Sequence, residues 1–396
     1  MSILVINAGS STLKFSLYDG EAKQRLAMGG MDWGGSEGTA AFSIEYTGAD
    51  EAAESTIEIA GHGEAAVYLI QALADSDQLT EAITAIGHRV VHGGEAFSGA
   101  MAIDEDVIGQ IRKLCSIAPL HNPPALAVIE AARAAMPDLP QVAVFDTAFF
   151  AGLPEEAYIY PLPYEWYEQW RVRRFGFHGT SHAHSTERAI EMLGRQDDPG
   201  VRVITCHLGS GCSASASIGG KAAATTMGLT PLEGLMMGTR PGSVDPGILI
   251  FALRESGMSP DELDQALNRK SGLLGVSGLS SDYREVETAA AAGNERAALA
   301  LSIFARRVRE TIGQLAADIG GADAVVFTAG IGQRSATHRA RVCEGLGFLG
   351  IELDEAANAA AEPDVDISTA DASTRVLVIS CRENYRIARE THRVLH

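Results

Sequence analysis

Short apolar runs rich in Val and Ile recur along the chain, and small or polar residues follow each of them. The runs cover residues 3–6, 142–145, 201–205, 324–327 and 376–379. Continuous β-branched runs of this length are typical of strands that are buried on both faces of a sheet. We therefore predict buried strands that deliver polar residues at their carboxyl ends.

The segments between these runs show helical periodicity. Ser259 followed by Pro260 predicts an N-cap for a helix over residues 261–268, and Asn122 followed by Pro123 predicts one for a helix through 125–135. Longer periodic stretches cover residues 295–317 and 383–395. Strands that alternate with helices indicate an α/β fold.

One spacing occurs twice. Asn7 and His207 each end a predicted strand, a glycine-containing turn and an alternating segment follow, and Gly20 or Gly220 comes 13 residues after the polar residue. Two similar domains would explain this spacing, as would a chance likeness between two common hairpins, and the spacing does not decide between them. A domain boundary is expected near residues 149–154.

The net charge of the chain indicates which classes of partner it is expected to bind. The 396 residues include 51 Asp plus Glu against 31 Lys plus Arg, so the formal net charge is −20. Such a chain is not expected to bind nucleic acid or an anionic membrane, and an anionic substrate would have to be held by a few local arginines. No apolar stretch is long enough to span a membrane and no basic leader precedes the first strand, so a cytoplasmic protein is expected.

The cysteines indicate no structural bridge. Their number is five and no C-x-x-C pair occurs, which favours neither a disulfide framework nor a zinc site.

Three glycine-rich segments are candidates for holding phosphate groups, at residues 7–12, 207–211 and 329–332. Turns without a Cβ let backbone N–H groups approach phosphate oxygens. One such turn would be weak evidence, whereas three of them favour a nucleotide or phosphate site over plain turns. The chain has no P-loop string and no Rossmann fingerprint.

Arg89, His178 and Arg240 stand beside glycines in uncharged surroundings. This placement is poor for a solvated surface charge and good for gripping an anion, although an arginine that forms a salt bridge or caps a helix would give the same pattern. The pairs His88/His92 and His178/His182 have the spacing of metal ligands on a helix, but the glycines around them argue against helix and therefore against metal binding.

Two carboxylates follow apolar strands, Asp146 and Glu383. Magnesium bound to nucleotide phosphates needs one or two protein carboxylates, so this pair is a candidate magnesium site. Helix capping is the alternative interpretation, because Asp146 precedes Thr147 and Glu383 begins the last predicted helix.

At these residues the chain resembles the acetate kinase family, within the acetate and sugar kinase, Hsp70 and actin superfamily. The resemblance covers nearly the whole chain, and it is carried by the strings GHRVVHGGE, FGFHGTSH, TPLEGLMMGTR, KSGLLGVSGLSSDYRE and VFTAGIG. It implies two similar domains with duplicated ribonuclease H-like (actin-like ATPase) cores flanking a cleft. These would be residues 1–148 with a C-terminal helix 384–396, and a nucleotide-binding domain 149–383. It also implies a homodimer.

The resemblance implies reversible, Mg²⁺-dependent, direct in-line transfer of a phosphoryl group from ATP to acetate, giving acetyl phosphate and ADP, with Mn²⁺ able to substitute. The implied catalytic residues are Arg89, Asp146, His178 and Arg240. The implied magnesium ligands are Asn7, Asp146 and Glu383. The residues implied to bind acetate are Arg89, Val91, Leu120, Phe177 and Pro231. The residues implied to bind nucleotide are Asn7, Ser10, Thr12, Lys14, His207, Leu208, Gly209, Ser210, Gly211, Asp282, Tyr283, Arg284, Gly330, Ile331, Gly332 and Arg334.

The chain departs from the family pattern at the nucleotide. Ser210 stands where the second phosphate turn usually has Asn, and Gln333 and Arg334 stand where Glu and Asn are usual. These departures leave nucleotide choice open. A kinase of propionate or another short-chain acid is the nearest alternative. A catalytically silent nucleotide-binding regulator is a further one, against which the presence of both arginines, His178 and both carboxylates argues.

Overall fold

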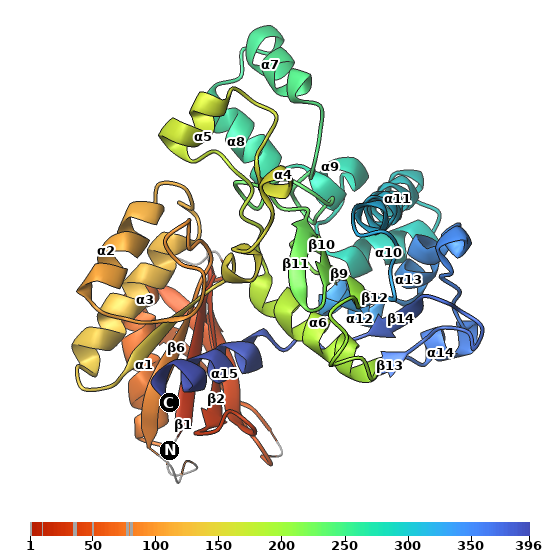
Figure 1. Ribbon diagram of the computed structural model, residues 1–396. Coiled ribbons are helices and arrows are strands. Elements are labelled where there is room, and N and C mark those ends of the chain that lie inside the picture. The colour runs from red at the N-terminus through yellow and green to blue at the C-terminus, as the bar shows by residue number, and fades with distance from the viewer. Residues whose placement is uncertain (1, 10, 35–37, 50, 77–78, 80–81) are drawn as a thin grey trace. The chain divides into compact units, whose positions relative to one another are not determined.

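The computed structural model describes residues 2–9, 11–34, 38–49, 51–76, 79 and 82–396. The chain divides into two compact units: unit 1 consists of Met1–Ala151 with Arg382–His396, and unit 2 consists of Gly152–Cys381. Ser10, which was expected to contact the nucleotide, lies outside the described residues. Figure 1 labels the helices and strands of both units.

Unit 1 is built on a sheet whose strand order is β5-β4-β3-β2-β1-β6-β8-β7 in the part of the chain that is described. β1 pairs antiparallel with β2 and parallel with β6, and β6 pairs parallel with β8. The strands are β1 (Ser2–Ala8), β2 (Thr12–Asp19), β3 (Arg25–Asp32), β4 (Thr39–Tyr46), β5 (Ala53–Glu58), β6 (Ile83–Val90), β7 (Met101–Ala102) and β8 (Gln141–Phe145).

Helices cover both faces of this sheet. The helical segments of unit 1 are α1 (His62–Ala74), α2 (Glu105–Leu114), α3 (Asn122–Ala135), the short 3₁₀ turn η1 (Ala148–Phe150) and α15 (Glu383–Leu395). Leu4 and Ile6 of β1 belong to the core that includes α1 and α3, whereas Ile3 and Val5 pack with Ile387 of α15. β1 is therefore buried on both faces, as its unbroken apolar run predicted.

Unit 2 repeats this plan. Its strand order is β11-β10-β9-β12-β14-β13, with β9 antiparallel to β10 and parallel to β12, and β12 parallel to β14. The order β3-β2-β1-β6-β8 in unit 1 has the same pairing directions, which confirms the duplication. The strands are β9 (Arg202–Leu208), β10 (Cys212–Ile218), β11 (Lys221–Thr225), β12 (Ala324–Thr328), β13 (Val365–Asp366) and β14 (Arg375–Val378).

Helix α6 (Gly179–Met192) packs on one face of this sheet through Ala189 and Ile190, and α11 (Glu295–Asp318) packs on β9 and β10. The remaining helical segments are α4 (Glu155–Tyr158), α5 (Tyr164–Trp170), α7 (Pro246–Glu255), α8 (Pro260–Arg269), α9 (Gly272–Ser277), α10 (Tyr283–Ala291), α12 (Ala329–Arg334), α13 (Ala336–Cys343), η2 (Gly347–Leu349) and α14 (Glu355–Ala359). None of the helices in the described residues combines the length and apolar character of a membrane span.

The helix predictions can be checked one by one. The helices predicted over 295–317 and 383–395 are confirmed, and Ser259 caps α8 in a capping box with Glu262. The prediction that Asn122 caps α3 is wrong, because Asn122 is already helical and His121 occupies the N-cap position. The Asn122 amide instead accepts from the backbone N–H of His92 and donates to its carbonyl, both at 3.0 Å. Asn122 therefore links α3 to the loop after β6 through two hydrogen bonds.

Two further predictions are wrong. Residues 329–332 do not form a turn between strands but the beginning of α12. His182, for which the neighbouring glycines argued against helix, lies in α6. Gly179 is the first residue of α6 and so does not weaken the interior of the helix, and His178 before it has a left-handed conformation with φ of 57°.

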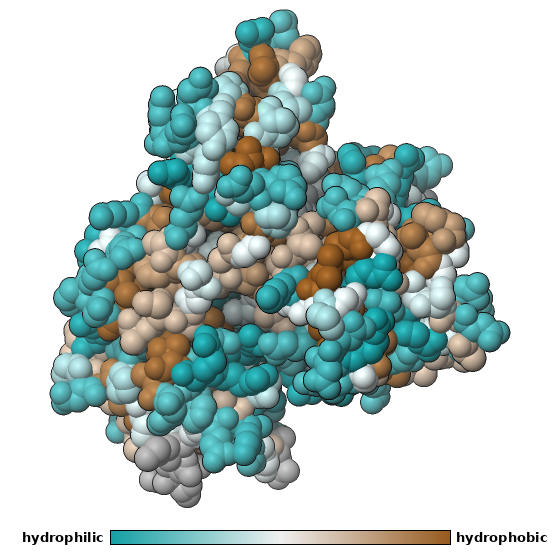
Figure 2. Space-filling model, in the orientation of Figure 1, coloured by the Kyte–Doolittle hydropathy of each residue, from teal (hydrophilic) through white to brown (hydrophobic). Residues whose placement is uncertain are grey.

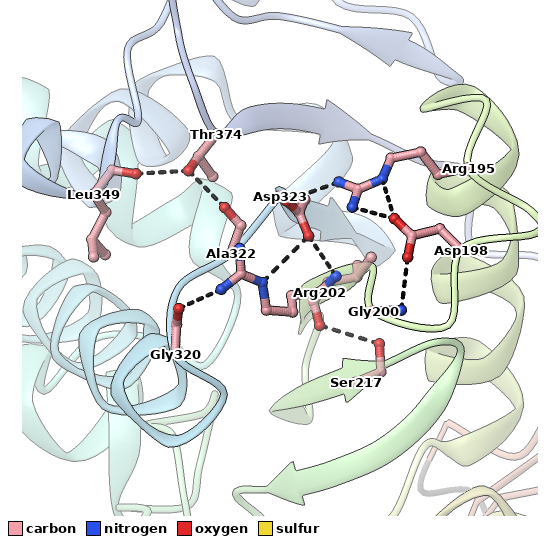
Figure 3. A network of polar contacts seen from close by, with 11 residues as sticks. Arg195, Asp198, Gly200, Arg202, Ser217, Gly320, Ala322, Asp323, Leu349 and Thr374 are labelled. Atoms are coloured by element: carbon pink, nitrogen blue, oxygen red, sulfur yellow. Dashed lines mark hydrogen bonds and ion pairs between the residues drawn. The ribbon is translucent and has the colours of Figure 1, made fainter.

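A polar network joins the amino ends of the central strands of unit 2 (Figure 3). The half-buried carboxylate of Asp323, immediately before β12, accepts from the backbone N–H of Arg202 at 2.7 Å and pairs with Arg195 at 2.8 Å. Thr374 donates to the carbonyl of Ala322 at 2.8 Å. Burial raises the pKa of Asp323, but the Arg202 amide and the guanidinium groups of Arg195 and Arg202 outweigh it, so that the net pKa lies below its ordinary value.

We predict that Asp323→Asn unfolds more easily, by about 1–2 kcal/mol at pH 7, because the variant loses a charged acceptor between β9 and β12. The native pKa of Asp323 is lowered, so its stabilising effect is present above the unfolded pKa and is lost as the pH falls through the native one. Urea unfolding of both proteins from neutral to acid pH should show the difference shrinking. A difference that stays constant with pH would contradict this role for the carboxylate.

Candidate active site

The parallel strands of unit 1 bring three of the predicted polar residues together. Asn7 is near the carboxyl end of β1, Arg89 is near that of β6, and Asp146 directly follows β8. The guanidinium of Arg89 donates from Nε to Asp146 Oδ1 at 3.1 Å, from Nη2 to Oδ2 at 2.6 Å, and from Nη1 to Asn7 Oδ1 at 3.1 Å. The Asp146 side chain is 1% exposed. Arg89 therefore holds a buried carboxylate in a bidentate ion pair, the alternative that the sequence left open for an arginine in this setting.

Glu383, the other expected magnesium ligand, is the first residue of α15 and is half-buried. The next residue, Asn384, donates to the Ser16 hydroxyl at 2.9 Å, and Ser16 is paired with Val5 in β1. The beginning of α15 thus lies beside β1, two residues before Asn7.

The first phosphate turn is described in part. The N–H of Gly9 donates to the carbonyl of Thr12 at 2.7 Å, which closes the turn between β1 and β2. Thr12 is half-buried, and Lys14 is exposed and paired in register with Asn7.

Unit 2 gathers a second cluster, around the second phosphate turn. His178 precedes α6, His207 lies within β9 rather than after it as expected, and their rings stack with centroids 4.2 Å apart. A Cβ atom at Gly211 would lie 2.9 Å from Arg240 Nη2 and 3.3 Å from His178 Nε2. The structure therefore brings His178, Arg240 and the glycine turn to one place.

Arg240 is the cation of this cluster. It donates from Nη1 to the carbonyl of Pro231 at 2.6 Å, and within the described ranges it forms no ion pair with a carboxylate. Burial lowers the pKa of Arg240, and Arg269 lowers it slightly further. A half-buried cation that donates to a backbone carbonyl favours an anionic ligand.

A cavity of about 490 Å³ adjoins the turn. It is lined by Gly209, Ser210, Ser281, Asp282, Tyr283, Arg284, Glu287, Gly330, Ile331, Arg334 and Ser335. Eight of these were expected to contact nucleotide. Ser281, Glu287 and Ser335 were not expected there. Glu287 could have been found, because it lies one helical turn after Tyr283 on the same face of α10.

Two other residues expected to bind nucleotide do not line the cavity. Leu208 is fully buried inside β9, and Gly332 is buried in α12.

The opening residues of α10 set the charge of the cavity. Asp282 caps the helix and accepts from the backbone N–H of Arg284 at 2.8 Å and from its Nη2 at 2.6 Å. The hydrogen bond from the Arg284 side chain is the largest of the effects that lower the pKa of Asp282 to about 2. Asp282 is therefore charged at neutral pH, and it orients the exposed guanidinium of Arg284 at the cavity.

The residues expected around the acetate methyl group come from both units. In unit 1, Val91 is buried and Leu120 is 40% exposed. In unit 2, Phe177 is buried and Pro231 is half-buried. Their joint pocket stays a prediction.

The histidine pairs do not form a metal centre. His88 is buried in β6 with Nε2 hydrogen-bonded to Gln141 at 2.7 Å, and burial lowers its pKa to about 4. His92 accepts the N–H of Gly94 at 3.0 Å. Across the described part of the chain, no three His, Cys, Asp or Glu side chains are grouped so that they could hold a metal ion.

Residues 2–389 match the acetokinase family. The chain belongs to this family. It is 47% identical over 398 residues to the acetate kinase of Methanosarcina acetivorans, covering 100% of this chain and 97% of that protein. The crystal structure of Porphyromonas gingivalis acetate kinase matches with a TM-score of 0.92 at 40% identity, over 100% of both chains.

A propionate kinase from Francisella tularensis matches with the same TM-score of 0.92 at 37% identity, over 99% of both chains. The acetokinase fold therefore includes proteins named for different short acids, and the fold alone does not identify the acid. The α/β class and the duplicated cores expected from the sequence are confirmed.

We predict that Gly211→Ala lowers the activity of this acetokinase by at least about 10-fold, because the added methyl group would displace Arg240 and His178. The backbone of Gly211 does not need a positive φ, so the fold should tolerate alanine. Gly313→Ala, in α11 with open space around the added methyl group, is the matched control. Equal activity of Gly211→Ala and the control would show that the turn does not adjoin the reacting groups.

Proposed function

We propose that the protein transfers the γ-phosphoryl group of ATP reversibly to acetate, giving acetyl phosphate and ADP. Membership of the acetokinase family makes it a phosphotransferase with a carboxylate acceptor. The observation that carries the proposal is the approach of Arg240 and His178 to Gly211, in a turn whose Gly209 and Ser210 line the 490 Å³ cavity. A nucleotide in this cavity would direct its phosphates along the turn.

The parts of the cavity suit the parts of a nucleotide. Gly330 has open space at its Cβ position, so an adenosine group could lie against the backbone of α12. The Gly209 N–H donates to the carbonyl of Gly211 at 3.1 Å and closes the turn, and phosphate oxygens would approach the backbone at Ser210 and Gly211. Arg240 and the Nε2 atom of His178 would then contact the transferred phosphoryl group, where charge redistributes during transfer. Ser210 is shorter than asparagine and offers no amide donor at this turn.

The donor set of unit 1 fits magnesium. Carboxylate and amide oxygens are its preferred protein ligands, and a single guanidinium holds Asp146 and Asn7 close together. We propose Asn7, Asp146 and Glu383 as the residues that hold Mg²⁺, directly or through water. Bound magnesium would neutralise nucleotide phosphate oxygens, and Mn²⁺ has the same ligand preference.

Acetate needs no general base, because its carboxylate is already ionised at neutral pH. Arg89 is proposed to orient this carboxylate, and the ion pair with Asp146 fixes the plane of its guanidinium. Transfer is then a matter of positioning and electrostatic stabilisation, with direct in-line attack and no covalent enzyme intermediate. We propose Arg89, Asp146, His178 and Arg240 as the catalytic residues of this transfer.

The direct test is to incubate the protein with ATP, Mg²⁺, acetate and hydroxylamine and to measure acetohydroxamate. We predict product with the wild type, and a loss of about 10²–10³-fold or more in Arg89→Ala and Arg240→Ala. Arg240→Lys should also fail, because an ammonium group cannot replace a planar fork of donors. If no short acid in a panel gave a hydroxamate, the alternative of a catalytically silent nucleotide-binding regulator would be favoured. Near-normal turnover in Arg240→Ala would show that Arg240 is not part of the site.

We predict that acetate is preferred to propionate by roughly 10-fold in kcat/KM, and by no more than about 200-fold, because apolar pockets discriminate single methylenes weakly. The branched Val91 leaves little room for an extra carbon. Val91→Ala should shift the preference towards propionate. An unchanged ratio would remove Val91 from the acyl pocket, and a wild type that prefers propionate would establish the alternative function.

We also propose that the protein is a homodimer that buries α7. This helix has no buried residue. Its large apolar side chains Ile248, Ile250 and Phe251 are each at least half exposed. Figure 2 shows apolar side chains at the surface of this helix, at the top of the view. Exposed apolar side chains on a helix favour an interaction surface, and the family resemblance implies that a second copy of the chain binds there.

We also propose a cytoplasmic location. Free thiols at all five cysteines fit this location.

We predict that Phe251→Glu shifts the protein from dimer to monomer in sedimentation at micromolar concentration, since it would bury a charge in the proposed interface. Glu255→Gln, at the end of the same helix, is the control and should remain dimeric. A Phe251→Glu protein that still sediments as a dimer would place the interface elsewhere.

A further inference from the structure

One serine hydroxyl joins two histidines in unit 2. Ser213 Oγ, on β10, lies 2.9 Å from His178 Nδ1 and 2.7 Å from His182 Nε2. His182 Nδ1 in turn lies 2.8 Å from the hydroxyl of Ser215. The side chains alternate as Ser215, His182, Ser213, His178, and the last of them reaches the Gly211 turn through Nε2.

The number of protons limits how this series can be arranged. A serine hydroxyl has one proton, so Ser213 donates to one of its two histidines and accepts from the other. A neutral imidazole carries its proton on only one nitrogen. The tautomers of His178 and His182 are therefore coupled, and only two arrangements of the series satisfy every contact between its members.

Ser215 distinguishes the two arrangements. It is 1% exposed, and in the described part of the chain His182 Nδ1 is the one hydrogen-bond partner of its hydroxyl. If His182 donated to Ser215, the buried hydroxyl proton would have no acceptor, which is costly. If Ser215 donates, only a lone pair stays unused. The favoured series runs from Ser215 to His182 Nδ1, from His182 Nε2 to Ser213, and from Ser213 to His178 Nδ1.

The environment of His182 supports a neutral ring. Its side chain is fully buried in α6, and this burial, with a smaller contribution from His207, lowers its pKa well below the ordinary value. A neutral ring with Nδ1 as acceptor and Nε2 as donor is what the series requires.

We propose that Ser215, His182 and Ser213 are positioning residues that hold His178 in the tautomer with its proton on Nε2. His178 then presents an N–H donor, rather than a lone pair, to the turn at Gly211. A donor is what a phosphoryl oxygen needs, and a lone pair there would repel it. This inference rests on the proposed function for the identity of the acceptor, but the tautomer itself can be measured without turnover.

The tautomer can be read by long-range ¹H–¹⁵N NMR on the full-length protein with ¹⁵N-labelled histidine, with His178→Gln used to assign the resonances. Wild-type His178 should show a protonated Nε2 and an unprotonated Nδ1. Ser213→Ala should abolish this preference, and Ser213→Thr, which keeps a hydroxyl, should restore it. Ser217→Ala is the matched control: it removes a buried hydroxyl on the same face of β10 that contacts the carbonyl of Val203 and not the histidines.

Kinetics give a second readout. Ser213→Ala should lower kcat by about 10–100-fold and leave KM for ATP and acetate within about two-fold, because an orienting contact that tunes a reacting group is lost. Ser217→Ala should match the wild type. If Ser213→Ala fails to fold, Ser215→Ala serves instead and should allow both tautomers of His178.

Two results would overturn the inference: wild-type His178 with its proton on Nδ1, or a Ser213→Ala protein with wild-type kcat and an unchanged tautomer. A wild type that forms no acyl hydroxamate but shows the Nε2 tautomer would instead overturn the proposed function and leave the series intact.

Discussion

Parallel pairing at the centre of each sheet is the constraint on which the functional groups depend. In unit 1 the register of β1, β6 and β8 brings Asn7, Arg89 and Asp146 to one edge, close enough for a single guanidinium to contact both other side chains. In unit 2 the register of β9 with β12 aligns His207 with Thr328, directly before α12. A shift by one residue in either sheet would turn these side chains to the opposite face. The hydrophobic runs that determine the register therefore also determine which polar side chains come together.

The second constraint is electrostatic. A chain with a net charge of −20 repels nucleotides at long range, so attraction must come from cations close to the ligand. The two units meet this need differently. Arg89 is neutralised by a buried carboxylate and is held in one orientation, whereas Arg240 is held by a backbone carbonyl and keeps its charge for a ligand. The first arrangement favours geometric precision and the second favours binding of an anion.

Much of the fold could be predicted from the sequence, because strand burial and helix capping are local signals. The apolar runs gave the central strands, and Ser259 gave the capping box of α8. Asn122 misled because its amide bonds to a distant loop, which no local pattern reveals. The glycines near His178 misled because Gly176 precedes α6 and Gly179 is its first residue, so neither lies in the helix interior.

For the site, the motifs named single residues but not their partners. The series from Ser215 to His178 joins the N-cap residue His178 and His182 of α6 to an i, i+2 serine pair on β10, and it forms only when the helix and the strand come together in the fold. Of the eight expected residues that line the cavity, Gly209, Ser210, Gly330 and Ile331 lie in segments that the glycine pattern already indicated, whereas the other four were expected only from the family resemblance. The acyl pocket and the magnesium ligands stay predictions.

The most direct measurement concerns whether Arg89 and Arg240 each stabilise the phosphoryl group during transfer. Calorimetry can follow the binding of aluminium fluoride, a planar mimic of that group in transfer, to the protein with ADP, Mg²⁺ and acetate. Arg89→Ala in unit 1 and Arg240→Ala in unit 2 should each weaken this binding by about 100-fold or more, while ADP alone binds as in the wild type. Wild-type affinity for the mimic in either variant would contradict a phosphoryl-transfer site that needs both arginines.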